Sequence, residues 1–170
     1  MKTTEPKIEQ RDEQPYVGIR TRVSIAELGS GIIPQLHDEV LAWMQQQGAA
    51  PSGPPFLRYH VINMADKMEI ELGWPVAQPV RGNERINADV LPAGRYASLI
   101  YTGVENGVAG NAVLIGWAQQ QGLVWDRWDT EAGDAFASRV EFHLTDPADE
   151  PDMSKWETEV AIKLAEEQAS

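Results

Sequence analysis

The chain has 170 residues, a length typical of one domain, and 42% of them are hydrophobic. It has no cysteine, which excludes disulfides, thiolate zinc sites and a thiol nucleophile. No stretch approaches the roughly 18 apolar residues of a membrane span, and a net charge of −12 repels phosphate backbones, so we expect a cytoplasmic protein without direct nucleic-acid or membrane partners.

The motif Trp-x-Gln-Gln-Gln-Gly occurs twice, at residues 43–48 and 117–122. In both copies the glycine stands where a helix ends in a left-handed residue. Apolar residues at helical spacing precede each motif and predict helices over about residues 32–47 and 108–121. The repeat therefore predicts two matched helices.

Similar strands surround each predicted helix. Residues 17–23 precede the first helix and residues 95–101 precede the second, and both segments have strand character. Two further strands follow each helix, at residues 56–61 and 68–74 in the first half and at residues 138–144 and 158–164 in the second. Apolar and polar residues alternate along most of these strands, which predicts one apolar and one polar face.

These elements predict an α+β fold built from two pseudo-twofold-related strand–helix–strand–strand modules. We expect a single domain over residues 1–170, with module one at about 8–80 and module two at about 84–165. Each helix should cover the apolar side of its antiparallel sheet. The polar faces would then meet around a central ligand groove.

One alignment of the two modules proposes the residues that face this groove. It matches Arg58-Tyr59-His60 with Glu141-Phe142-His143 and places Tyr59 toward the helix. The side chains expected on the groove side are then Phe56, Arg58, His60, Glu141 and His143. The alternative, that these are ordinary solvent-facing residues of antiparallel strands, stays open.

Three tryptophans add to the candidate site. Trp125 and Trp128 fall in an acidic segment after the second helix, and Trp156 opens the last strand. Each is expected either to cap the edge of the core or to line the ligand site. The three histidines are scattered and the chain has no phosphate-binding loop, so we expect neither a metal nor a cofactor.

The order of these elements resembles the GyrI-like, or gyrase-inhibitor-like, small-molecule-binding domains, which also form the effector-binding part of AraC-type and MerR-type multidrug regulators. The resemblance rests on LPAGRYA (91–97), RVEFHLTDP (139–147) and the closing strand WETEVAIKL (156–164), and it covers about residues 8–165. It implies an aromatic groove with a buried glutamate that attracts lipophilic cations. Glu141 matches that glutamate and Trp156 matches a pocket aromatic.

The resemblance also frames the expected function. No helix-turn-helix flanks the modules, so we expect a stand-alone binding protein for hydrophobic, cationic or aromatic small molecules. One alternative is a hydrolase that opens the cyclopropane of DNA-alkylating natural products. In that case Glu141 would orient or deprotonate water while Trp125 and Trp156 sandwich the drug. Another alternative is a partner of gyrase or of a regulator.

Overall fold

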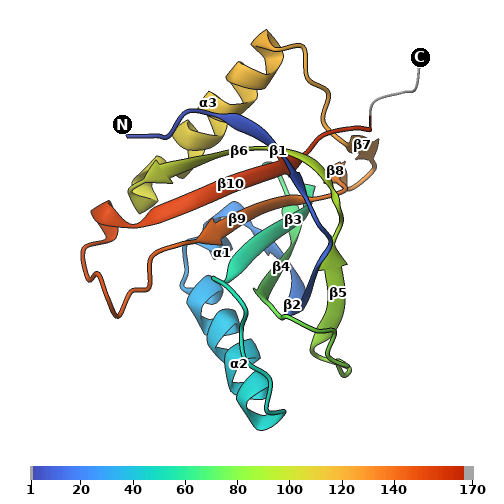
Figure 1. Ribbon diagram of the computed structural model, residues 1–170, viewed down its shortest axis with the longest axis vertical. Helices are drawn as coiled ribbons and strands as arrows, with labels where there is room; N and C mark the ends of the chain where they lie inside the picture. Colours follow the sequence, from blue (N-terminus) through green and yellow to red (C-terminus); the bar gives the residue numbers. More distant parts are fainter. Residues whose placement is uncertain (1, 167–170) are drawn as a thin grey trace.

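The computed structural model describes residues 2–166. Its strands form one ten-stranded sheet in the order β1-β6-β10-β9-β3-β4-β2-β5, with the β7–β8 hairpin attached to β3, and all pairings are antiparallel (Figure 1). The strands are β1 (Lys7–Arg11), β2 (Gln14–Ser24), β3 (Phe56–Ile62), β4 (Lys67–Pro75), β5 (Asn87–Leu91), β6 (Gly94–Thr102), β7 (Arg127–Thr130), β8 (Gly133–Phe136), β9 (Arg139–His143) and β10 (Glu157–Lys163). The α-helices are α1 (Ile25–Leu28), α2 (Ile32–Gln46) and α3 (Gly107–Gln120), and the short 3-10 helices are η1 (Val104–Asn106) and η2 (Met153–Lys155).

The predicted α+β duplication is confirmed by the order of the elements. The first copy is β2, α2, β3 and β4, and the second is β6, α3, β9 and β10. Between α3 and β9 the second copy gains the β7–β8 hairpin, where the sequence indicated only an acidic loop. Within residues 2–166, every helix falls short of the length and apolarity that a membrane span needs.

The repeated Trp-x-Gln-Gln-Gln-Gly motif closes both long helices in the same way. Gly48 and Gly122 have φ angles of 71° and 70°, the left-handed region that glycine enters at little cost. The amide after each glycine donates back into the last turn, from Ala49 to Met44 at 2.9 Å and from Leu123 to the Ala118 carbonyl at 3.0 Å. Both helix ends are therefore Schellman motifs, as the repeat predicted.

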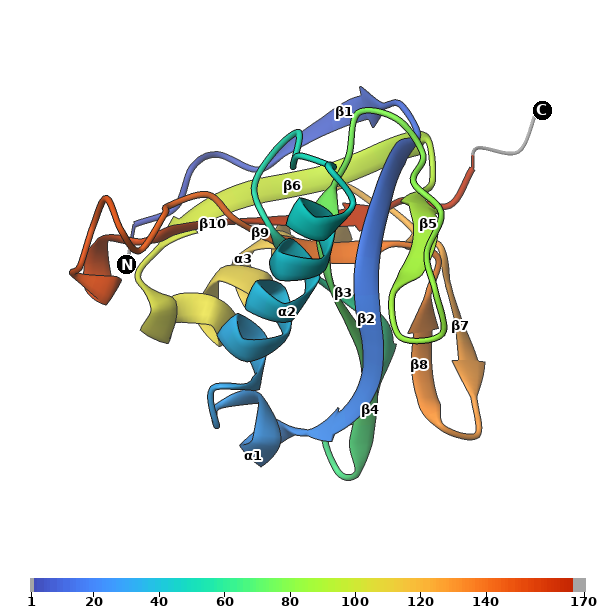
Figure 2. The ribbon, with the colours of Figure 1, turned by 90° about the horizontal axis from the view of Figure 1, so that it is seen from below.

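The edge strands are exchanged between the two copies. β1 precedes the first copy but pairs with β6 of the second, whereas β5 precedes the second and pairs with β2 of the first (Figure 2). β5 and β6 begin 80 residues after β1 and β2, so the exchange obeys the same twofold relation as the modules. The predicted boundary between the modules therefore does not separate them in space.

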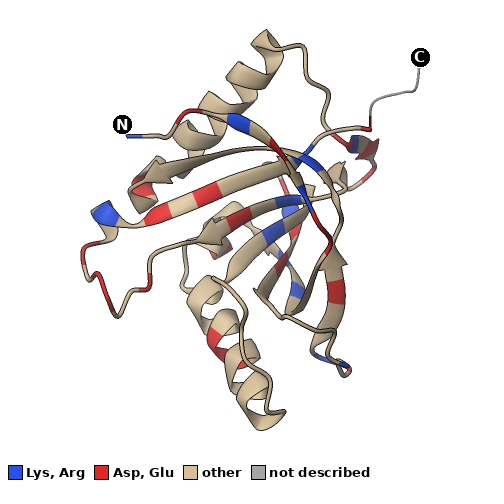
Figure 3. Cartoon of the chain, viewed as in Figure 1, with Lys and Arg blue, Asp and Glu red and all other residues tan. Residues whose placement is uncertain are grey.

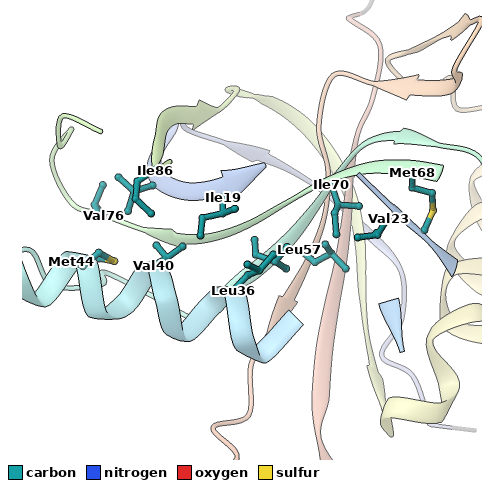
Figure 4. Close-up of a cluster of buried hydrophobic side chains, with 12 residues drawn as sticks. Ile19, Val23, Leu36, Val40, Met44, Leu57, Met68, Ile70, Val76 and Ile86 are labelled. Carbon is teal, nitrogen blue, oxygen red and sulfur yellow. The ribbon is translucent and has the colours of Figure 1, made fainter. Parts of the chain in front are cut away.

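Three apolar clusters hold the sheet and helices together. Under α2, Leu36, Val40 and Met44 pack at helical spacing against the sheet (Figure 4). Under α3, Leu114 packs against strands of the second copy. A third cluster lies on the sheet face turned away from the helices and consists of Tyr16, Phe56, Leu91, Tyr96, Val140 and Ala161, with Phe142 packed against it. Both faces of the sheet centre are thus apolar, so a polar side chain on either face is surrounded by apolar residues.

Candidate functional site

A single row of paired residues crosses the sheet beneath both helices and locates the candidate site. The strand registers place six residues side by side on the helix-bearing face, in the order Ile19, Leu72, Leu57, Glu141, Val160 and Leu99. Five are buried apolar residues, and Glu141 is the partly exposed exception. Glu141 belongs to β9, and Figure 1 shows that this strand runs between α2 and α3.

Polar groups from three elements surround the Glu141 carboxylate. The Tyr101 hydroxyl donates to its Oε2 at 3.1 Å, and Tyr59 and Asn111 also hydrogen-bond to it. Desolvation raises the pKa of Glu141 above its ordinary value, although these hydrogen bonds and the charge of Arg139 pull the pKa down. The ion pairs found within residues 2–166 do not include Glu141. Within the part of the chain that the structure describes, the carboxylate therefore has hydrogen bonds but no cation in contact.

Two histidines face each other beside this carboxylate. His143 follows Glu141 by two positions on β9, and its ring meets that of His37 on α2 edge to face, with centroids 5.6 Å apart. Desolvation, and secondarily the nearby His37, lowers the pKa of His143 to about 4, so the imidazole is neutral at pH 7. Among residues 2–166, no group of three His, Cys, Asp or Glu side chains is arranged to hold a metal ion.

We call the side chains on this face between the helices the interhelical strip, and it consists of Tyr59, Arg139, Glu141 and His143. Arg139 lies two residues before Glu141 and donates from Nη2 to Asn111 Oδ1 at 2.9 Å. The strip therefore carries a guanidinium, a carboxyl group and a neutral imidazole at alternate positions of β9. Figure 3 shows the basic and acidic residues following each other along this strand.

The predicted groove side was wrong for three residues. Leu57, not Arg58, is the register partner of Glu141, so Phe56 and Arg58 point to the opposite face. His60 also points there, where its Nε2 lies 2.8 Å from Glu71 Oε1. A shift of one residue moves every side chain of a strand to the other face, and this slip separated Glu141 from its expected neighbours.

On that opposite face, Arg58 and His60 belong to a buried network around Glu71. Tyr16 donates to Glu71 Oε1 at 2.5 Å, Asn87 donates to Oε2 at 2.9 Å, and Arg58 donates to the Tyr16 hydroxyl at 2.9 Å. Burial raises the pKa of Glu71, but hydrogen bonds from His60, Tyr16 and Asn87 outweigh it, so the pKa lies below its ordinary value. Glu71 is therefore an internal, ionised structural group.

The three tryptophans occupy different environments. Trp125 bridges to Leu164 and packs against the cluster under α3, as a residue that caps a core edge does. Trp128 lies on β7 and is 51% exposed. Trp156 precedes Thr158, the register partner of His143, by two residues, and its Nε1 donates to the Glu150 carbonyl at 2.7 Å. Of the three, Trp156 stands at the end of the interhelical strip.

Five polar neighbours of the site were not among the predicted site residues: Tyr59, Tyr101, Asn111, Arg139 and His37. Arg139 could have been found from alternation alone, because residues 139, 141 and 143 share one face of a strand. Tyr101, Asn111 and His37 could not, since they come from β6, α3 and α2. Their approach depends on tertiary packing rather than on any local pattern.

The opposite face holds a cavity of about 430 Å³, lined in part by Tyr96, Val140 and Phe142. Glu141 does not line it, because Val140 and Phe142 alternate with Glu141 along β9. Its lining combines apolar residues with the polar Gln14 and Ser52, and its charged residues, Arg11, Asp12 and Glu13, come from the β1–β2 turn region. The polar chemistry around Glu141 is thus separate from this cavity.

Solved structures share this fold. The C-terminal domain of EcmrR matches with a TM-score of 0.67 and 18% identity, over 96% of this chain and 98% of that domain. In an EcmrR–DNA complex the TM-score is 0.72, again at 18% identity, and the match covers 96% of this chain but 58% of the EcmrR chain, so this chain spans less than two thirds of that protein. SAV2435 bound to tetraphenylphosphonium matches with a TM-score of 0.60 and 12% identity, over 95% of this chain and 94% of SAV2435.

A hydrolase from Listeria innocua also matches, with a TM-score of 0.60 and 13% identity, over 95% of this chain and 92% of that one. At such identities these likenesses show the fold alone. No curated protein matches the sequence. The family comparison is specific, because residues 4–165 match the GyrI-like small molecule binding domain. This chain therefore belongs to the GyrI-like small-molecule-binding domain family.

Proposed function

We propose that this domain binds hydrophobic aromatic cations on the interhelical strip, with Glu141 as the group that attracts their charge. The observation that carries the proposal is a carboxyl group with a raised pKa, on a partly exposed residue set in a row of buried apolar residues. Such a carboxylate gains a counterion when a cation arrives. The phosphonium ligand of SAV2435, a protein of the same fold, supports this class of ligand.

Aromatic side chains around Glu141 suit a flat or bulky aromatic ligand. The hydroxyls of Tyr59 and Tyr101 hydrogen-bond to the carboxylate, and Trp156 stands at one end of the strip. A cation over an aromatic ring gains roughly 0.5–2 kcal/mol where water is excluded. The acidic net charge of −12 also favours the approach of cations over long distances.

Calorimetric titration with tetraphenylphosphonium would test this proposal. The wild type should bind it, and should bind the uncharged triphenylphosphine oxide at least tenfold more weakly. The Glu141→Gln variant should lose at least tenfold in affinity for the cation. Glu159→Gln is the matched control, because Glu159 lies on the neighbouring strand, pairs with Phe142 on the opposite face, and is held by Arg11 at 2.9 Å. Equal affinity in the wild type and the Glu141 variant would refute the role of this carboxylate.

A second candidate function is hydrolysis of a strained cyclopropane, favoured by the raised pKa of Glu141 beside two phenol groups. Glu141 would take a proton from water, whose oxygen bonds to a ring carbon as one C–C bond breaks. The released electron pair would pass into the conjugated system of the drug, which then takes up a proton. Mass spectrometry decides between the two functions: a recovered alkylator that has gained one water indicates hydrolysis, and an unchanged one indicates binding alone.

A further inference from the structure

The interhelical strip contains more polar chemistry than a simple cation requires. Arg139 and His143 flank Glu141 at the two neighbouring same-face positions of β9. Consecutive same-face positions on a strand are about 7 Å apart. A ligand seated over Glu141 would therefore have a permanent cation on one side and an imidazole on the other.

Arg139 is incompletely partnered. Its Nη2 donates to Asn111, and its guanidinium lies 4.9 Å from the centre of the Phe136 ring. Its Nε is buried and has no hydrogen-bond partner. Within residues 2–166, no carboxylate forms an ion pair with this guanidinium, although the charge of Glu141 acts on it at longer range. Buried donors are nearly always satisfied in folded proteins, so this Nε–H is free to donate to a ligand.

His143, at the other end of the strip, also has a side-chain nitrogen without a hydrogen-bond partner. Its Nε2 is buried without a hydrogen-bond partner, while its ring contacts His37. A neutral imidazole nitrogen can donate or accept, depending on the tautomer. Two of the five buried side-chain atoms without partners in residues 2–166 thus lie on β9, on either side of Glu141.

We infer that the ligand of this strip is an amphoteric aromatic molecule, with a cationic group against Glu141 and a carboxylate or other anionic group about 7 Å away against Arg139. The inference rests on the proposed function and narrows its ligand class. A purely cationic ligand would satisfy Glu141 but add a second positive charge beside Arg139. An amphoteric ligand meets both charges and, being neutral overall, is not repelled by the acidic protein.

A matched pair of fluorescent dyes provides the test. Rhodamine 6G is a cationic ethyl ester, and rhodamine 19 is its free acid, which carries an additional carboxylate at pH 7. Fluorescence anisotropy should show that the wild type binds the free acid at least tenfold more tightly than the ester. Arg139→Met should remove this preference and leave ester binding equal or tighter, whereas Arg139→Lys should retain part of it. Arg127→Met, on the exposed β7–β8 hairpin, is the control and should behave as the wild type.

The outcomes separate this inference from the proposed function. Ester binding equal to or tighter than free-acid binding in the wild type would overturn the amphoteric ligand and leave the cation site standing. An unchanged preference in a folded Arg139→Met variant would also overturn it. Absence of binding for both dyes and for tetraphenylphosphonium would overturn the proposed function itself.

Discussion

Replacing Glu141 by leucine should stabilise the fold while removing cation binding. Its register partner Leu57 is 3% exposed, and the other residues of the row are buried and apolar, so leucine fits the surroundings. A fully buried leucine contributes about 1.5–3 kcal/mol, and about half of that applies at this partly exposed position. The lost hydrogen bonds from Tyr101, Tyr59 and Asn111 cost about 1 kcal/mol each, and relief from burying the carboxylate, which is worth several kcal/mol, offsets them.

We therefore expect the free energy of unfolding of the Glu141→Leu variant to be about 1 kcal/mol higher than that of the wild type at pH 7, which corresponds to a rise in Tm of about 2–4 °C. The advantage should depend on pH. Because the folded state raises the pKa of Glu141, the protonated carboxyl favours folding at low pH, and this contribution is lost as pH rises through the raised pKa. The advantage of leucine should thus grow from pH 4 to pH 8.

Urea unfolding of both proteins across this pH range, followed by circular dichroism, measures the difference directly. The same preparations should be titrated with tetraphenylphosphonium, which the variant should no longer bind. A variant less stable than the wild type by 1 kcal/mol or more at pH 8 would show that the carboxylate is a structural group. In that case Glu141 would be a structural group like Glu71, and the proposed binding role of Glu141 would be refuted.

Two further predictions concern the framework around the site. Gly116→Ala should stabilise α3 by about 0.5–1 kcal/mol, because nothing lies within 4 Å of the added methyl. Gly110→Ala should destabilise the protein by about 1–3 kcal/mol, because its methyl would lie 2.6 Å from the Tyr101 ring. Urea unfolding in which both variants changed the free energy of unfolding in the same direction would contradict the packing of α3. Glu71→Gln should cost about 2–4 kcal/mol at pH 7 without changing cation affinity. Because the pKa of Glu71 is lowered, its contribution is lost as pH falls below about 4.5, so the difference between the two proteins should narrow in acid, and a constant difference would refute ionised Glu71.

The repeated motif predicted the ends of both long helices correctly, because the conformation of a helix end depends on the local sequence. A helix that ends in a left-handed residue needs glycine there, and Gly48 and Gly122 meet that need independently of tertiary contacts. The alternating strands were equally readable. The edge strands β1 and β5 were not, since nothing in the local sequence says that each pairs with the other copy.

The faces of the central strands could not be read from alternation. The pattern of β9 separates Val140 and Phe142 from Glu141, but it does not say which set faces the helices. In a sheet covered by helices on one face, the apolar residues, here Val140 and Phe142, are expected to face the helices. Instead they pack into the third cluster with Tyr16 and Phe56, because the helix-free face of the sheet has a core of its own. Because of this second core, the apolar residues of β9 face away from the helices and Glu141 faces toward them.

The duplication itself shows why a carboxylate stands at this place. By the strand registers, Leu57 in the first copy and Glu141 in the second are equivalent, and they are also direct neighbours across the β3–β9 pair. The first copy completes the apolar row under its helix, and the second interrupts the row with an acid that contacts no cation among residues 2–166. Equivalent positions of the two copies accommodate both side chains, so the position in the fold does not by itself explain the acid. Its neighbours Arg139 and Asn111 also belong to the second copy, whereas Tyr59 comes from β3 of the first, so under the proposed function both copies contribute to the site.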